Sequence, residues 1–210
     1  MVKKFSTFSV PLGLLDYVNP ILYTVTKTTV IRNLYSQMGS PYNYLLLIGA
    51  IISIFFGFII PTGKVIVGLG IIDFVMPVSL VFCVNSGILL SGLVLFKHIM
   101  NLDNVVFGIM AVLIVALLIF VYSKHKKINT IAVLTGAVGY LLIYISLITL
   151  SIQKGLIIPI ILYAIAILLF VMLVGIGIKG DLKNPKVHWV IEISNVICQL
   201  LVAAATVMIW

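Results

Sequence analysis

Five polar side chains share one face of the last apolar segment of the chain. They follow one another at offsets of 4, 3, 4 and 7 residues: His188, Glu192, Asn195, Gln199 and Thr206. At about 100° per residue in a helix, these offsets keep all five within an arc of roughly 60°. A carboxylate in hydrocarbon costs at least about 2.5–3.5 kcal/mol, so we expect this face to point into the protein interior or a wet cavity.

Two interpretations of this stripe remain open. In the first it lines a substrate or proton path, with Glu192 as the titratable group, Asn195 and Gln199 as hydrogen-bonding walls, and His188 on the same face. In the second the amides and hydroxyls only bond neighbouring helices. Glu192 lies about one turn beyond Trp189 and could therefore sit near the lipid headgroups.

Asp73 is the second candidate for chemistry inside the membrane. Apolar residues flank it, and Pro77 follows four positions later. A carboxylate near mid-membrane must be paired, protonated or solvated by a cavity, and broken helices of this kind line transporter sites. The alternative is that Asp73 caps the broken backbone or bonds a tyrosine. Asp73 and Glu192 could belong to one relay, but the sequence does not place them side by side.

Asp16 and Asn19 form the polar face of the segment Phe8–Val25, and Pro20 is expected to end or kink it. If this segment lies in the interface, both side chains are simply solvated, which is the interpretation the sequence favours.

Motifs of familiar enzymes and metal sites do not occur in the sequence. The three histidines stand in unrelated positions, and no H-E-x-x-H, G-x-S-x-G, P-loop or dinucleotide fingerprint is found. We therefore predict neither a metal nor a cofactor, and the sequence leans away from an enzyme without deciding the question.

Composition identifies the element type that must position these residues. Hydrophobic residues make up 63% of the 210 positions and charged residues 9%, against about 25% charged in soluble domains. Mean hydropathy is +1.33. The net charge of +8 is scattered between apolar runs, which indicates topology determinants rather than a nucleic-acid surface. We predict an all-α, polytopic transmembrane bundle forming a single integral membrane domain over residues 1–210, in the cell membrane.

Five spans are predicted at the roughly 20 residues that a helix needs to cross a bilayer: Tyr44–Ile60, Asn104–Tyr122, Ile128–Ile152, Leu156–Ile178 and Val187–Trp210. Two segments are ambiguous. Within the N-terminal part, residues 1–43, Phe8–Val25 either spans or lies in the interface. Val65–Phe96 is either one tilted or broken helix or a hairpin turning at Asn85-Ser86-Gly87.

Lysine and arginine accumulate on the cytoplasmic side, so their distribution helps to choose. If Phe8–Val25 spans and Val65–Phe96 crosses once, the 13 basic residues split nine to four; with the hairpin and no N-terminal crossing they split ten to three. Both solutions have seven spans with a cytoplasmic N-terminus. Seven is therefore favoured, within a range of six to eight.

Small residues recur four positions apart and predict close helix packing, as in lipid, where no hydrophobic force joins helices. They are Gly49, Ser53 and Gly57, Gly87 and Ser91, and Ala132 and Gly136.

The leading hypothesis is a small permease or channel-like transporter of a small solute or ion, with Asp73, Glu192, Asn195, Gln199 and His188 along the path. One alternative is an enzyme acting on a lipid or isoprenoid, which predicts a lipid-shaped cavity holding both acids. Another is a non-catalytic subunit or scaffold, which predicts that the polar stripe contacts a partner chain. Expected partners are the lipid bilayer, the solute or ion, and other helices through an oligomer or a partner subunit. Substrate, coupling ion, direction and oligomeric state are not readable from the sequence.

Overall fold

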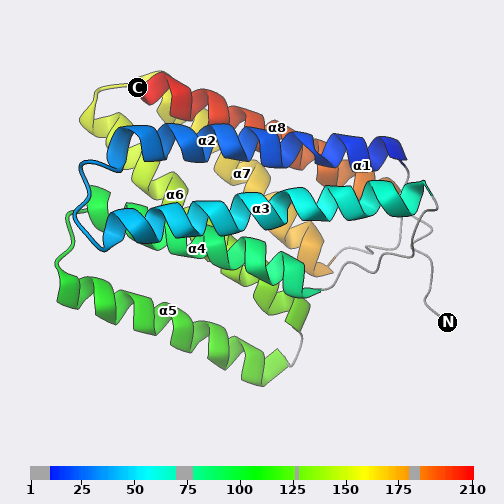
Figure 1. The fold of residues 1–210 in the computed structure, drawn as a ribbon, viewed down its shortest axis with the longest axis horizontal. Coiled ribbons are helices and arrows are strands. Elements are labelled where there is room, and N and C mark those ends of the chain that lie inside the picture. The colour runs from blue at the N-terminus through cyan, green and yellow to red at the C-terminus, as the bar shows by residue number, and fades with distance from the viewer. Residues whose placement is uncertain (1–9, 70–77, 126–127, 180–184) are drawn as a thin grey trace.

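The computed structural model describes residues 10–69, 78–125, 128–179 and 185–210. All secondary structure in these ranges is helical (Figure 1), and the helices are α1 (Val10–Asp16), α2 (Val18–Leu34), α3 (Tyr42–Gly68), α4 (Val78–Ile99), α5 (Asn104–His125), α6 (Ile128–Gln153), α7 (Ile157–Lys179) and α8 (Pro185–Ile209). Within the described part of the chain, six of them, α3 to α8, are long and apolar enough to cross a membrane. The chain is thus a polytopic helical bundle and an integral membrane protein.

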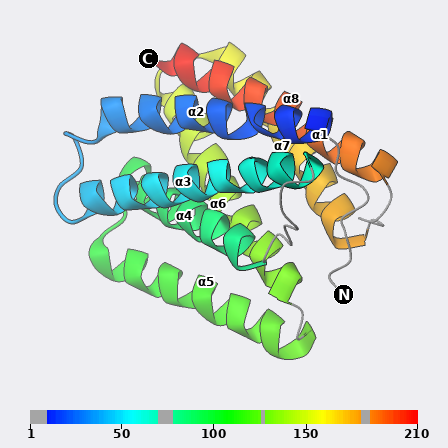
Figure 2. The same ribbon diagram turned by 45° about the vertical axis from the view of Figure 1, so that its right-hand side comes forward.

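The N-terminal segment runs the length of the bundle as a broken helix. Pro20 has no backbone N–H to donate to the carbonyl of Asp16, and α1 ends at Asp16 while α2 begins at Val18. Together α1 and α2 cover positions 10–34, about 37 Å at roughly 1.5 Å per residue. Both views show them alongside α3 over most of its length (Figures 1 and 2). The predicted effect of Pro20 is confirmed. Neither α1 nor α2 is among the six candidate spans of the described residues, so the favoured count of seven spans stays a prediction.

Two sequence-based boundaries are wrong. The span predicted to end at Ile60 continues as α3 through Pro61 to Gly68, so Lys64 lies in a helix and not in a loop. Proline is tolerated in such helices because neighbouring groups satisfy the freed backbone. The turn predicted at Asn85-Ser86-Gly87 is also absent, because α4 passes through it without a break. The side chain of Asn85 instead links α4 to α6, because its Nδ2 donates to the carbonyl of Ala132 at 2.7 Å.

The predicted small-residue seams are helix contacts. A Cβ built on Gly49 would lie 2.8 Å from the carbonyl oxygen of Gly87, and one built on Gly87 would lie 2.6 Å from that of Gly49. The backbones of α3 and α4 therefore touch directly. A second close approach joins α4 to α6, where a Cβ on Gly92 would lie 2.5 Å from the carbonyl oxygen of Gly139.

The buried core lies between α2, α4, α6, α7 and α8. Its largest fully buried side chains include Tyr144 and Tyr163. By contrast, α5 lies at one edge of the bundle in both views (Figures 1 and 2) and carries exposed apolar side chains such as Val105, Val112 and Leu117. Such a helix suits contact with lipid tails.

Candidate functional site

A lysine and two carboxylates meet inside the bundle. Lys64 Nζ donates to Asp16 Oδ2, and it also donates to Glu192 Oε1 at 3.1 Å. The three groups come from α1, α3 and α8, which lie far apart in the sequence. Their side chains are buried, with 6–8% of each residue exposed. We call Asp16, Asn19, Lys64 and Glu192 the charged cluster.

Asn19 joins both carboxylates to the start of α2. Its Nδ2 donates to Asp16 Oδ1 at 3.4 Å and to Glu192 Oε2 at 3.3 Å. Asp16 and Asn19 are three positions apart, a spacing that places both side chains on the face turned to α3 and α8. Asn19 Oδ1 is buried and has no hydrogen-bond partner in the part of the chain that the structure describes. A hydrogen-bond acceptor is therefore left over next to two further acceptors.

Counted over the described residues, the charged cluster carries one acid more than it carries bases. If all three groups ionise, two carboxylates face one ammonium, and one negative charge is uncompensated in a buried site. Burying such a charge is expensive, and a proton or a bound cation would remove the cost. Asn19 Oδ1 could accept a hydrogen bond from a protonated carboxyl group, or it could bind the cation.

The stripe on α8 faces inward as expected at three of its five positions. Glu192, Gln199 and Thr206 are buried, whereas His188 and Asn195 are half-buried. Glu192 makes an ion pair with Lys64. Deeper in the bundle, Gln199 Nε2 donates to Tyr140 Oη at 3.4 Å, and the hydroxyls of Tyr163 and Thr206 lie 2.8 Å apart. The two halves of the stripe therefore differ, with charge at one end and interhelical hydrogen bonds at the other.

The other charged residues of the sequence had different outcomes in the structure. Asp73 lies outside the described residues. The favoured interpretation of Asp16 and Asn19 as solvated groups is wrong, because both are only 8% exposed and take part in the charged cluster. Lys64 falls in the predicted loop between Ile60 and Val65, and its burial was not expected. One feature of the sequence does indicate it, because Lys64 is the sole charged residue between Arg32 and Asp73. An isolated charge in a long apolar stretch is expected to seek a buried partner.

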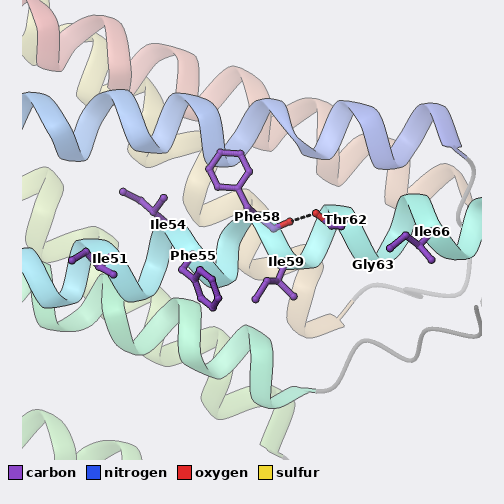
Figure 3. Close-up of a pocket in the computed structure, with 8 residues that line it drawn as sticks. All are labelled: Ile51, Ile54, Phe55, Phe58, Ile59, Thr62, Gly63 and Ile66. Carbon is purple, nitrogen blue, oxygen red and sulfur yellow. Dashed lines mark hydrogen bonds between the residues drawn. The ribbon is translucent and has the colours of Figure 1, made fainter.

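A large apolar groove lies on α3, separate from the charged cluster (Figure 3). Its volume is about 600 Å³, and its lining includes Ile54, Phe55, Phe58 and Ile59. Figure 3 shows Phe58 on the side of α2 and Phe55 on the side of α4. None of the described acids lines it. The groove matches the chemistry of lipid tails and provides no polar path.

The described residues contain no group of three or more His, Cys, Asp or Glu side chains arranged to hold a metal ion. Comparison of the chain with protein-family models, with curated proteins and with solved structures finds no match to any of them. The function must therefore be inferred from the charged cluster and its surroundings.

Proposed function

We propose that this chain is a small transporter of the cell membrane that moves a small solute or ion, and that the charged cluster is the centre at which a proton or cation binds and leaves. The observation that carries the proposal is the buried excess of acid over base among Asp16, Lys64 and Glu192. A purely structural cluster would gain from balanced charge, since an uncompensated buried charge is costly. An exchange centre needs the imbalance, because it must hold a proton or cation in one state and release it in another.

The position of the charged cluster fits this role. Asp16 ends α1, Lys64 lies one turn before the end of α3, and Glu192 lies two turns after the start of α8. These ends lie at the same side of the bundle (Figures 1 and 2). A small outward movement of α1, which is joined to α2 at a break, would open the charged cluster to water at that side. The residue at the break, Tyr17, is linked to α3 by a hydrogen bond of 2.7 Å from its hydroxyl to Thr62.

The cavity in the centre of the described bundle is too small to pass a solute. The cavity next to Gln199 has a volume of about 20 Å³, which is close to the space that one water molecule needs, about 10–15 Å³. Transport therefore requires a second conformation, as in carriers that alternate between two open states.

The alternatives receive less support. The enzyme hypothesis predicts a lipid-shaped cavity that holds Asp73 and Glu192. Glu192 does not line the large groove on α3, and Asp73 lies outside the described residues. The scaffold hypothesis predicts that the polar stripe contacts a partner chain, but Glu192, Gln199 and Thr206 bond to residues of the same chain.

Proton flux in liposomes tests the proposal. The purified protein is reconstituted into vesicles that contain a pH-sensitive dye, and gradients of sodium, potassium, chloride or a mixture of neutral amino acids are imposed one at a time. We expect at least one gradient to change the internal pH, and Glu192→Gln and Asp16→Asn to abolish this change because each removes an ionisable group.

Asp103→Asn is the matched control. Asp103 is a carboxylate outside the charged cluster that caps α5 by accepting from the N–H groups of Val105 and Val106, and asparagine retains this capping ability. The variant should keep the wild-type flux. Unchanged flux in both Glu192→Gln and Asp16→Asn, with monodisperse protein, would overturn the proposal, as would the absence of any gradient-driven pH change.

A further inference from the structure

A second buried basic group lies deeper in the bundle. Lys27 on α2 is only 3% exposed, yet its Nζ has no hydrogen-bond partner among the described residues. Both ion pairs found in this part of the chain belong to Lys64, so Lys27 has no counter-charge there. Within the same residues, the electrostatic contact of Lys27 is with the ring of Tyr23, whose centroid lies 5.1 Å from Nζ. A buried ammonium in this position needs further stabilisation.

Lys27 lines the small cavity next to Gln199. Three aromatic residues from α2 and α6, Tyr23, Tyr140 and Tyr144, share this lining, as does Gln199 from α8. Gln199 is 3% exposed, and its Oε1 has no hydrogen-bond partner. Two polar atoms without a partner in the described residues, Lys27 Nζ from α2 and Gln199 Oε1 from α8, therefore belong to side chains that line the same space and are more than nine-tenths buried.

The lining is rich in hydrogen-bond donors. The ammonium of Lys27 has three N–H groups, and Tyr140 accepts from Gln199, which leaves its own hydroxyl proton available to the cavity. The two ends of the Gln199 amide exchange by rotation about its last bond. In the reversed orientation its carbonyl accepts from Tyr140 and its NH2 group points into the cavity. No carboxylate contributes to the lining.

From this arrangement we propose that the cavity is a binding site for a single small inorganic anion of the size of a halide. The ammonium of Lys27 supplies the charge, and one neutral hydrogen bond comes either from the Tyr140 hydroxyl or, with the Gln199 amide reversed, from the Gln199 NH2 group. A volume of about 20 Å³ admits an ion little larger than water and excludes sulfate, gluconate and carboxylate-bearing solutes. The anion removes the uncompensated charge at mid-bundle, which a water molecule does not.

This site is distinct from the charged cluster. Lys27 follows Asp16 by eleven residues, roughly 16 Å along a helix, and Gln199 follows Glu192 by seven, roughly 10 Å. The inference does not depend on transport, since an anion bound permanently at this position would have the same chemistry.

Halide-dependent thermal stability tests the site. The purified full chain in neutral detergent is held at constant pH and ionic strength while gluconate is replaced by chloride or bromide, and the unfolding midpoint is followed by tryptophan fluorescence. We expect the midpoint to rise with halide concentration and to saturate, because a ligand that binds only the folded state stabilises it. Lys27→Met should weaken the apparent halide affinity about 10- to 100-fold, the loss expected for a hydrogen bond to a charged group.

Lys97→Met is the control, because this lysine lies over the ring of Tyr42 and donates to the carbonyl of Leu102, away from the cavity. It should keep the halide response. Tyr140→Phe provides a second variant with a smaller loss, and bromide density within the cavity in a crystal gives a direct measurement. A wild-type midpoint that ignores halide, or an equal response in Lys27→Met, would overturn the proposal and leave water as the occupant.

Discussion

At the scale of single residues, Lys64 determines how the N-terminal segment is used. Asp16 and Asn19 stand in a segment whose polarity suits an interfacial location, and nothing near them in sequence offers a partner. Lys64 comes from a helix 48 positions away and supplies that partner. Lys64 and Glu192 provide the hydrogen bonds that Asp16 and Asn19 would otherwise make to water. The segment α1 can therefore pack inside the bundle instead of lying on its surface.

Removing Lys64 should therefore destabilise the fold strongly. Lys64→Met leaves Asp16 and Glu192 buried together without a cation, and we expect a loss of about 3–5 kcal/mol in the free energy of unfolding. The triple variant Asp16→Asn, Lys64→Met, Glu192→Gln keeps the side-chain shapes and removes every charge, so it should recover most of the loss. Unfolding in mixed micelles of denaturing and neutral detergent measures both. A Lys64→Met protein as stable as wild type would show that the ion pairs contribute nothing.

The residues of the site were only partly predictable. The inward orientation of Glu192 and Gln199 was predictable because polar residues recur on one face of the last apolar segment. This periodicity is local and can be seen in the sequence alone. Lys64 and Asp16 were missed because their burial depends on each other across two helices. Pairing of this kind is a tertiary property, and one sequence without relatives contains no trace of it.

At the scale of helices, close backbone contact holds α3 against α4. Glycines at positions 49 and 87 face each other, and each leaves no room for a Cβ. The four-residue spacing of small side chains predicted this seam correctly, because it reflects one helix face only. The end of α3 was not predictable in the same way. Pro61 indicates a helix end in soluble proteins, whereas in a bundle its neighbours decide whether the helix continues.

Gly49→Ala tests the seam between α3 and α4. The new methyl group would lie 2.7 Å from Ser91 Oγ and 2.8 Å from the carbonyl oxygen of Gly87, so the helices must move apart. We expect a loss of about 1–3 kcal/mol in the free energy of unfolding, typical of overpacking. Gly108→Ala is the matched control, because a Cβ there meets nothing within 4 Å and alanine favours the helix. Equal stabilities of the two variants would contradict direct backbone contact.

At the scale of the whole molecule, the number of traverses fixes which loops share a side. The start of α1 and the end of α8 lie at opposite ends of the bundle, and α1 and α2 run alongside α3 as one broken traverse (Figure 1). The connection between α4 and α5 and that between α6 and α7 then lie at the end where α8 finishes. Lys154, in the latter connection, donates to the carbonyl of Ile209 at 2.9 Å, which places them together directly. Of the seven lysines in the described residues, four lie towards the other end: Lys64, Lys124, Lys179 and Lys186. The positive-inside rule therefore predicts that this end faces the cytoplasm.

Labelling of single cysteines with a membrane-impermeant maleimide tests this topology in intact cells. In a background in which Cys83 is replaced by alanine, Asn101→Cys and Gln153→Cys should react from outside, because both exposed positions lie at the end predicted to be extracellular. Ser123→Cys, an exposed position near the end of α5, should react only after the membrane is permeabilised. Cys198 is buried and should stay silent in all variants. Reaction of Ser123→Cys from outside, with protection of Asn101→Cys and Gln153→Cys, would reverse the orientation and the assignment of the charged cluster to the cytoplasmic side. Labelling of Asn101→Cys and Ser123→Cys from the same side would contradict a single crossing by α5, on which the count of seven depends.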